Sequence, residues 1–233
     1  MTEVNAASEA AVTHEIVFQP IVRLDDWQVV AYEALARFSD SRSPLTHLAE
    51  ARAAGHIVEL ELELIASATK AAGELPPDVM VTMNASGETI LDRRLGELLV
   101  DRSHEWGIEL SELSAVASYS VLRDAVKELG VVLLIDDAGA RHADIERVMQ
   151  STPSIVKVDK SVLQSAFDPA GDQQALGQYG AAARSVGALA LAEGVETPAQ
   201  ARRLLESGFE LGQGYLFGYP ASAVTWARAA ENR

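Results

Sequence analysis

The sequence contains no cysteine. Disulfide bonds, thiol catalysis and metal sites built on thiolates are therefore excluded. Histidine is also scarce, and none of its residues forms a ligand-like pair at the end of a predicted strand. The five histidines are His14, His47, His56, His104 and His142. A zinc site of the usual cysteine and histidine type is thus not expected.

Basic residues are in the minority. Lys and Arg number 19 against 34 Asp and Glu, which gives a formal net charge of −15. Binding of a nucleic-acid duplex depends on clustered Lys and Arg side chains, and the sequence has no such cluster, so we expect no duplex as a partner. An acidic chain can still bind a small phosphodiester where metal ions invert the local charge.

Long apolar runs are missing as well. The longest obvious run, residues 131–135, is far shorter than the roughly 20 residues of a membrane-spanning helix. Residues 1–11 are polar and acidic, with no basic start or apolar core, and do not resemble a secretory signal. We therefore expect no membrane partner and a cytoplasmic location.

Apolar residues are plentiful, since 48% of the 233 residues are hydrophobic. One α/β barrel commonly has this length. Short apolar runs alternate with Ala- and Leu-rich helical stretches, which is typical of repeated βα units. The predicted strands are residues 15–23, 28–37, 79–84, 108–112, 131–136, 155–159, 189–193 and 211–216. Helical patterns fill the gaps, among them residues 45–54, 58–72, 119–129, 144–150, 173–186 and 198–206.

The first two strands are joined only by Asp25, Asp26 and Trp27. This connection is too short for a parallel crossover, so the two strands must form an antiparallel hairpin. The predicted fold class is therefore α/β, a TIM-like (β/α)8 barrel with an antiparallel first strand. We expect the domain to span residues 13–228, with residues 1–12 and 229–233 as frayed termini.

Polar side chains gather at the ends of the predicted strands, and these ends meet at the mouth of a barrel. They are Glu33, Asn84, Glu109, Glu112, Asp136, Asp137, Lys157, Asp159, Glu193 and Gln213. One such residue often does no more than cap the next helix, but so complete a set indicates a site. Oxygen donors favour Mg²⁺ or Mn²⁺, and crowded carboxylates require counter-ions.

Six segments, in order, resemble the motifs of a known family, the EAL-domain phosphodiesterases that hydrolyse cyclic di-GMP. They are Phe18-Gln19-Pro20-Ile21-Val22 with Tyr32-Glu33-Ala34-Leu35-Ala36-Arg37-Phe38, Glu109-Leu110-Ser111-Glu112, Asp136-Asp137-Ala138-Gly139, Lys157-Val158-Asp159-Lys160, Ala192-Glu193-Gly194-Val195-Glu196-Thr197 and Gln213-Gly214-Tyr215-Leu216. The resemblance covers about Glu15 to Pro220. It implies a cyclic-guanylate-specific phosphodiesterase that binds cyclic di-GMP and releases linear pGpG.

The resemblance also implies roles for single residues. Two divalent cations, Mg²⁺ or Mn²⁺, would be held by Glu33, Asn84, Glu109, Asp136, Asp137 and Glu193. Lys157, Glu193 and Asp137 would be catalytic, with Lys157 holding the attacking water and Asp136 bridging the two cations. Substrate contacts are implied for Gln19, Leu35, Arg37, Asp159 and Gln213. Glu112 resembles the residue that anchors the loop after Asp137.

That loop departs from the family pattern, because residues 138–144 read Ala-Gly-Ala-Arg-His-Ala-Asp instead of Phe-Gly-Thr-Gly-Tyr-Ser-Ser. An alternative is therefore a degenerate EAL domain that binds cyclic di-GMP or a protein partner without significant turnover. A third hypothesis is an unrelated barrel enzyme that uses paired acids such as Asp136 and Asp137 on a sugar or an acid. The sequence leaves open whether the chain forms a homodimer.

Overall fold

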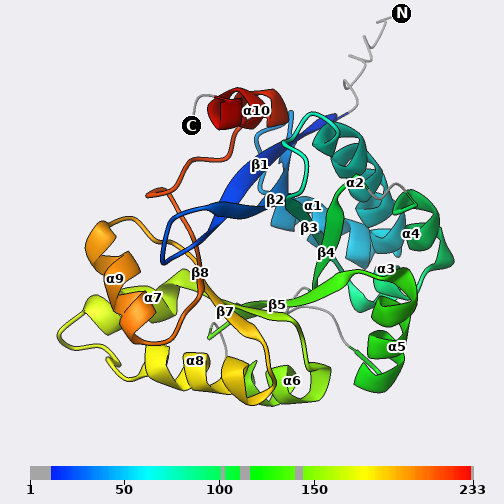
Figure 1. The fold of residues 1–233 in the computed structure, drawn as a ribbon. Helices are drawn as coiled ribbons and strands as arrows, with labels where there is room; N and C mark the ends of the chain where they lie inside the picture. The colour runs from blue at the N-terminus through cyan, green and yellow to red at the C-terminus, as the bar shows by residue number, and fades with distance from the viewer. Residues whose placement is uncertain (1–11, 101–102, 111–115, 140–143, 232–233) are drawn as a thin grey trace, which may run out of the picture.

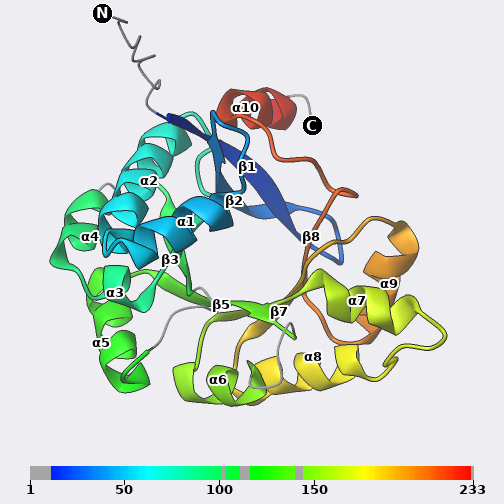
Figure 2. The same cartoon turned by 180° about the vertical axis from the view of Figure 1, so that it is seen from behind.

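The structure, a computed structural model, describes residues 12–100, 103–110, 116–139 and 144–231. Eight strands in this part of the chain close into a barrel in sequence order (Figures 1 and 2). They are β1 (His14–Arg23), β2 (Val29–Phe38), β3 (Met80–Ala85), β4 (Glu105–Leu110), β5 (Val132–Ala138), β6 (Ile155–Val158), β7 (Leu189–Ala192) and β8 (Leu211–Gln213). β1 runs antiparallel to both β2 and β8, whereas all other neighbours are parallel. The predicted fold class is therefore confirmed.

Helices pack around the outside of the barrel (Figure 1). They are α1 (Pro44–Ala53), α2 (Ile57–Ala72), α3 (Gly87–Ile90), α4 (Arg93–Leu98), α5 (Tyr119–Leu129), α6 (Asp144–Ser151), α7 (Lys160–Phe167), α8 (Ala175–Ser185), α9 (Pro198–Glu206) and α10 (Ala223–Glu231). Among the described residues, none of them combines the length and the apolar character that a bilayer-crossing helix needs.

Some boundaries differ from the sequence-based expectation. β4 begins at Glu105 rather than at residue 108, because β3 offers pairing partners from Met80 onward. β8 ends at Gln213 rather than at residue 216, because Gly214 turns the chain with φ +155°. Helix α10 continues through Glu231, so part of the range expected to fray is helical.

The buried apolar residues form two separate clusters. The larger cluster lies between the strands and the surrounding helices and includes Phe18, Trp106 and Phe209. The smaller cluster, here called the barrel plug, fills the barrel interior with strand residues. It consists of Ile21, Ala31, Leu134, Ile155, Leu191 and Leu211. The plug closes the interior below the mouth, so any ligand must enter from the mouth.

Candidate active site

A layer of polar side chains lies directly above the barrel plug. Alternate residues of a strand point to the same face, so a residue two positions beyond a plug residue also points into the barrel. Five plug residues are followed in this way by a polar residue, namely Ala31 by Glu33, Leu134 by Asp136, Ile155 by Lys157, Leu191 by Glu193 and Leu211 by Gln213. Together with Glu109 on β4, these six residues are here called the polar layer.

Lys157 stands at the centre of the polar layer and is 1% exposed. Its Nζ atom lies 2.5 Å from Glu109 Oε2, 2.9 Å from Asp136 Oδ1, 2.9 Å from Glu193 Oε1 and 3.5 Å from Glu33 Oε1. The contact with Glu109 is also a hydrogen bond. One ammonium group thus faces four carboxyl groups in a buried place.

Amides connect this cluster to the neighbouring strands. Asn84 Nδ2 donates to Glu33 Oε1 over 3.3 Å, and Gln213 Nε2 donates to Glu33 Oε2 over 2.7 Å. Gln213 Nε2 also lies 3.3 Å from Gln19 Oε1, which accepts from it. Glu33 is therefore held in place from both sides, by β3 and by β8.

Four buried oxygen atoms have no hydrogen-bond partner among the described residues. They are Glu109 Oε1, Asp136 Oδ1, Thr82 Oγ1 and Gln213 Oε1. Asp136 Oδ1 faces the Lys157 ammonium but is not aligned for a hydrogen bond. Buried polar atoms are nearly always paired, so the two carboxylate oxygens fit a site that takes a cation or a water molecule.

Burial and charge shift the pKa values of the cluster. Burial raises the pKa of Glu109 well above its ordinary value, and the charges of Glu33 and Asp136 raise it further. Burial also raises the pKa of Glu193 to about 8, against the opposing effect of Lys157. For Lys157 itself, burial lowers the pKa, but the carboxylates outweigh burial and hold it well above its ordinary value. The ammonium therefore stays charged at neutral pH.

The donor set suits a hard cation, because it offers carboxylate and amide oxygens only. As the side chains stand, no group of three acidic or histidine residues in the described ranges is arranged to hold a metal ion. Lys157 instead lies among the carboxylates that would do so. Glu109 Oε1 and Asp136 Oδ1 accept no hydrogen bond from the described residues, so both have capacity to bind a cation.

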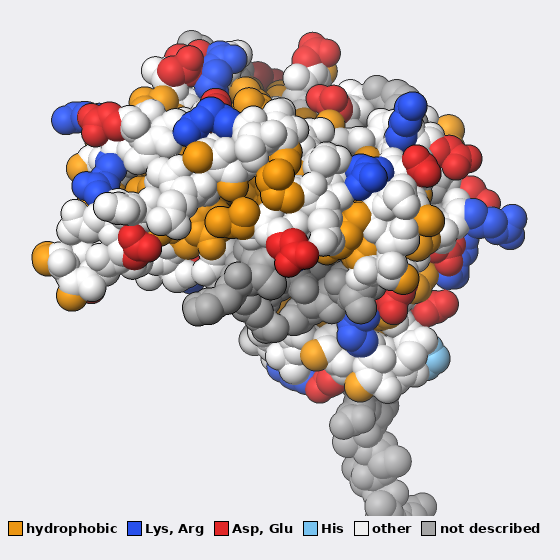
Figure 3. Space-filling view, turned by 90° about the horizontal axis from the view of Figure 1, so that it is seen from below, with side chains coloured by type: hydrophobic (Ala, Val, Ile, Leu, Met, Phe, Trp, Pro, Cys, Tyr) orange, Lys and Arg blue, Asp and Glu red, His pale blue; other side chains and the backbone are white. Residues whose placement is uncertain are grey.

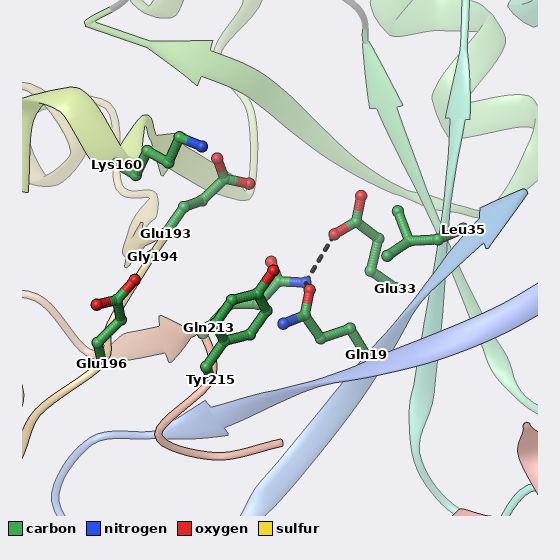
Figure 4. Close-up of a pocket in the computed structure, with 10 residues that line it drawn as sticks. Gln19, Glu33, Leu35, Lys160, Glu193, Gly194, Glu196, Gln213 and Tyr215 are labelled. Atoms are coloured by element: carbon green, nitrogen blue, oxygen red, sulfur yellow. Dashed lines mark hydrogen bonds between the residues drawn. The ribbon is translucent and has the colours of Figure 1, made fainter. Parts of the chain in front are cut away.

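A pocket with a volume of about 230 Å³ opens beside the polar layer (Figure 4). Five of the predicted site residues line it, namely Gln19, Glu33, Leu35, Glu193 and Gln213. Lys160, Glu196 and Tyr215 also line it, although the sequence analysis gave them no role. All three lie within the motifs quoted above, just beyond the ends of β6, β7 and β8. This position in the motifs is the sequence feature that could have identified them.

Two glycines bring these loops together. Gly214 has φ +155°, and a Cβ atom there would lie 2.2 Å from the carbonyl oxygen of Val195. Gly194 has φ +70°, and a Cβ atom there would lie 2.5 Å from Lys160 Cβ. Both positions therefore require glycine, and their close contacts set the shape of the pocket.

Two of the predicted substrate contacts, Asp159 and Arg37, lie outside the pocket lining. Asp159 is the N-cap of α7, where its Oδ1 accepts from the backbone N–H of Ser161 over 2.8 Å. Arg37 donates from Nη1 to the carbonyl oxygen of Ala36 over 2.8 Å. The side chain of Asp137 and the whole of Glu112 lie outside the described part of the structure.

Comparison with known proteins identifies the family. The model of the EAL domain matches residues 5–220. Protein y4lL of Sinorhizobium fredii is 28% identical over 90% of this chain, and the cyclic di-GMP phosphodiesterase RocR of Pseudomonas aeruginosa is 26% identical over 88%. The chain spans 27% and 57% of the lengths of these two relatives.

Solved structures agree with this result. Klebsiella pneumoniae BlrP1, in a manganese/cy-diGMP complex, superimposes with a TM-score of 0.78 at 26% identity, over 90% of this chain and 56% of BlrP1. The match of the EAL model to most of the chain confirms the resemblance seen in the motifs. The chain belongs to the EAL domain family.

Proposed function

We propose that the chain is a metal-dependent phosphodiesterase that hydrolyses cyclic di-GMP to linear pGpG. The observation that carries this proposal is the polar layer, in which four carboxylates from four strands surround one ammonium group beside an open pocket. Relatives named as cyclic di-GMP phosphodiesterases support the choice of substrate.

The polar layer would provide the cation ligands. Glu33, Asn84, Glu109, Asp136 and Glu193 have the oxygen donors that Mg²⁺ or Mn²⁺ prefers, and Asp137 is proposed with them from its place in the motif. Two bound cations would supply Lewis-acid activation of water and stabilise charge on the phosphoryl oxygens. Four carboxyl groups surround a single ammonium group, so their ionised forms can balance the charge of the bound cations.

The chain's own groups would orient the reaction. Hydrolysis adds the oxygen of water to phosphorus, breaks the bond from phosphorus to the 3′ oxygen and delivers a proton to that leaving oxygen. Lys157 Nζ keeps its charge and can hold the attacking water by donating to it. Glu193, whose Oε1 lies 2.9 Å from Lys157 Nζ, can accept a proton in its ionised form.

The pocket lining would hold the substrate. Gln19, Leu35 and Gln213 line the pocket next to Glu33, so a phosphodiester seated there lies against the polar layer. A volume of about 230 Å³ is below the 300–1,000 Å³ common for small-molecule sites, so the pocket encloses only part of a cyclic dinucleotide. We also propose substrate contacts for Arg37 and Asp159, which would come from outside the lining.

The test is to incubate the protein with cyclic di-GMP and Mg²⁺ or Mn²⁺ and to measure linear pGpG by chromatography. Glu33→Ala should abolish metal-dependent product formation and leave the folded circular dichroism spectrum intact. Glu97→Ala, which removes an exposed carboxylate from α4, is the matched control and should keep the wild-type rate.

Three outcomes would count against the proposal. Unchanged turnover in Glu33→Ala would refute the role of Glu33. Equal loss in Glu97→Ala would mean that the effect is not specific to the site. Binding of cyclic di-GMP in Ca²⁺ without product in Mg²⁺ or Mn²⁺ would favour the alternative, a degenerate EAL domain that only binds.

We further propose that the chain forms a homodimer through the face on the side of α6 and α8. Hydrophobic side chains gather in the middle of this face, with charged side chains around them (Figure 3). Ile145 and Met149 of α6 are 42% and 48% exposed. Light scattering after gel filtration tests this, and a mass of one chain at all concentrations would refute it.

A further inference from the structure

Helix α2 carries an acidic side chain on its buried face. Glu61 is 6% exposed. The other buried residues of this helix are apolar, namely Ile57, Leu62, Ile65, Ala68 and Ala72. A carboxyl group is rarely buried unless polar partners satisfy it, because its removal from water is costly. The position of Glu61 is therefore explained by its polar partners rather than by apolar packing.

The donors that face Glu61 come from the segment that follows β3. Glu61 Oε2 accepts from the backbone N–H of Ser86 over 2.9 Å, from Ser86 Oγ over 2.7 Å and from Thr89 Oγ1 over 2.5 Å. Ser86 and Thr89 are both 0% exposed. Hydrogen bonds to a carboxylate are stronger than those between neutral groups. Three such bonds therefore tie this segment to the middle of a 16-residue helix.

Helix α3 is attached to its surroundings more weakly on the side of α1. Arg52 Nη1 lies 3.0 Å from Glu88 Oε2, but these two side chains are 36% and 56% exposed. Exposed ion pairs stabilise a fold little. At the other end of α3, Ser86 is the N-cap and its Oγ accepts from the N–H of Thr89 over 3.4 Å. The buried bonds to Glu61 are thus the firmer attachment of this segment.

The segment fixed by Glu61 begins two residues after Asn84. The ladder between β2 and β3 ends at Thr82, whereas the ladder between β3 and β4 continues to Ala85. Asn84 therefore has a strand partner on one side, and the bonds at Ser86 supply a second support. Because Asn84 Nδ2 donates to Glu33 Oε1 over 3.3 Å, a shift of this backbone would move the amide relative to Glu33.

We propose that Glu61 is a positioning residue for the cation site. Through Ser86 it fixes the end of β3 and so holds the Asn84 amide beside Glu33, where the two residues can share a cation. Its own Oε2 faces Ser86 and Thr89, so Glu61 touches neither the cation nor the substrate. The inference rests on the proposed function for the presence of that cation.

The first test is calorimetric binding of Mn²⁺ to the whole chain and its variants. Loss of a group that supports a metal ligand commonly weakens metal affinity by about 10- to 100-fold, so Glu61→Ala should weaken it by about tenfold or more. Glu61→Gln keeps an acceptor of the same shape but accepts weaker bonds, so we expect a loss of about fivefold. Glu63→Ala removes a 68% exposed carboxylate from the same helix and should bind like wild type.

A second control separates positioning from a general loss of stability. Leu62→Ala removes a buried apolar side chain from the same helix and keeps the acceptor of Glu61. It should lower the urea concentration at the midpoint of unfolding, yet its Mn²⁺ affinity should stay within about twofold of wild type. Circular dichroism shows whether each variant is folded, and Glu61→Gln provides the test if Glu61→Ala does not fold.

A double-mutant cycle tests whether Glu61 acts through Asn84. Residues that act through one another have effects that do not add, whereas the effects of independent residues do. Asn84→Ala should weaken Mn²⁺ binding by itself, and adding Glu61→Ala to it should weaken binding by no more than about a further twofold. A role of Glu61 in stability alone would instead give the full loss again.

The outcomes separate this inference from the proposed hydrolysis. Mn²⁺ affinity within twofold of wild type in folded Glu61→Ala and Glu61→Gln would overturn the positioning role. Full addition in the cycle with Asn84→Ala, or an equal loss in Leu62→Ala, would overturn it as well. Wild type that forms pGpG while Asn84→Ala binds Mn²⁺ normally would overturn the positioning role and keep the hydrolysis. The predicted pattern of Mn²⁺ affinities without any pGpG would keep the positioning role and overturn the hydrolysis.

Discussion

The barrel plug and the polar layer lie on the same strands and the same face, two residues apart, yet they are stabilised in opposite ways. Leu134 and Leu191 of the plug are 0% exposed and pack within an apolar cluster. Asp136 and Glu193, two positions further, lie 2.9 Å from one shared ammonium group. The plug is held by apolar packing, whereas the polar layer is held by ion pairs and hydrogen bonds.

This difference shows how one fold provides both support and function. Packing in the plug fixes the strands, because deletion of buried apolar groups is costly and the interior has little free space. The strands then hold the carboxylates of the polar layer close together, although their mutual repulsion would separate them in a flexible chain. Each of the following predictions concerns a change in one of the two layers and tests the difference between them.

The largest effect is expected from Lys157→Met, which removes the only cation of the polar layer in the described structure. Removing one partner from a buried ion pair costs about 3–5 kcal/mol, so the free energy of unfolding in urea should fall by about 4 kcal/mol without metal. Mg²⁺ should restore part of this loss, because a cation that binds only the folded state stabilises it.

Lys70→Met is the matched control for that variant, since Lys70 is exposed on α2. Its stability should stay within about 0.5 kcal/mol of wild type. Lys157→Met as stable as Lys70→Met would mean that the carboxylates of the polar layer do not depend on the ammonium group.

A similar but metal-independent loss is expected from Leu134→Ala in the plug. A buried Leu→Ala change costs about 2–5 kcal/mol through lost burial and the cavity left behind, and we expect about 3 kcal/mol here. Urea unfolding with and without Mg²⁺ checks this. A loss that Mg²⁺ restores in full would contradict the distinction between the two layers.

A smaller effect is expected from Gly107→Ala, which adds one methyl group at the level of the plug. A Cβ atom there would lie 2.8 Å from Thr82 Cγ2 and 3.0 Å from Leu134 Cδ1. Overpacking of this kind costs about 1–3 kcal/mol, and we expect about 1.5 kcal/mol. Stability equal to wild type in urea would show that the plug has spare volume at this point.

The smallest effect concerns pH. In the metal-free protein the pKa of Glu193 is raised to about 8, so its carboxyl is protonated below that pH and a cation must displace the proton. The apparent affinity for Mg²⁺ should therefore fall by up to tenfold per unit as the pH drops below about 8. Calorimetry in two buffers of different ionisation enthalpy would detect the released proton. Glu193→Gln should show a weaker pH dependence, and an identical dependence would exclude Glu193 as its source.

The sequence predicted the eight strands and the antiparallel hairpin because both follow from local patterns. A short apolar run identifies each strand, and a connection of three residues permits only one arrangement. Helices α3 and α4 were not predicted because they have only four and six residues, too few for a helical period to stand out. Helices α7 and α10 were also absent from the predicted ranges.

The same local patterns also predicted which carboxylates lie close together. Glu33, Glu109, Asp136 and Glu193 were expected together at strand ends, and they do surround a common point. That this point is the ammonium group of Lys157 could not be predicted, because it depends on distances across the barrel that no local pattern records.

Other parts of the site have no distinctive local signal. A carboxylate after a strand can face the site or cap the next helix, and Asp159 caps α7. The pocket rim at Lys160, Glu196 and Tyr215 is shaped by the backbone of Gly194 and Gly214. Their positive φ angles and close contacts arise only when the loops meet in three dimensions.

The most direct test of the account is anomalous diffraction at the manganese edge from crystals grown with Mn²⁺. The account predicts two strong peaks at the barrel mouth, at about 2.0–2.5 Å from oxygens of Glu33, Asn84, Glu109 and Asp136. It also predicts that Lys157 Nζ moves away from those carboxylates. Peaks only at surface carboxylates, with Lys157 still at the centre of the polar layer, would contradict it.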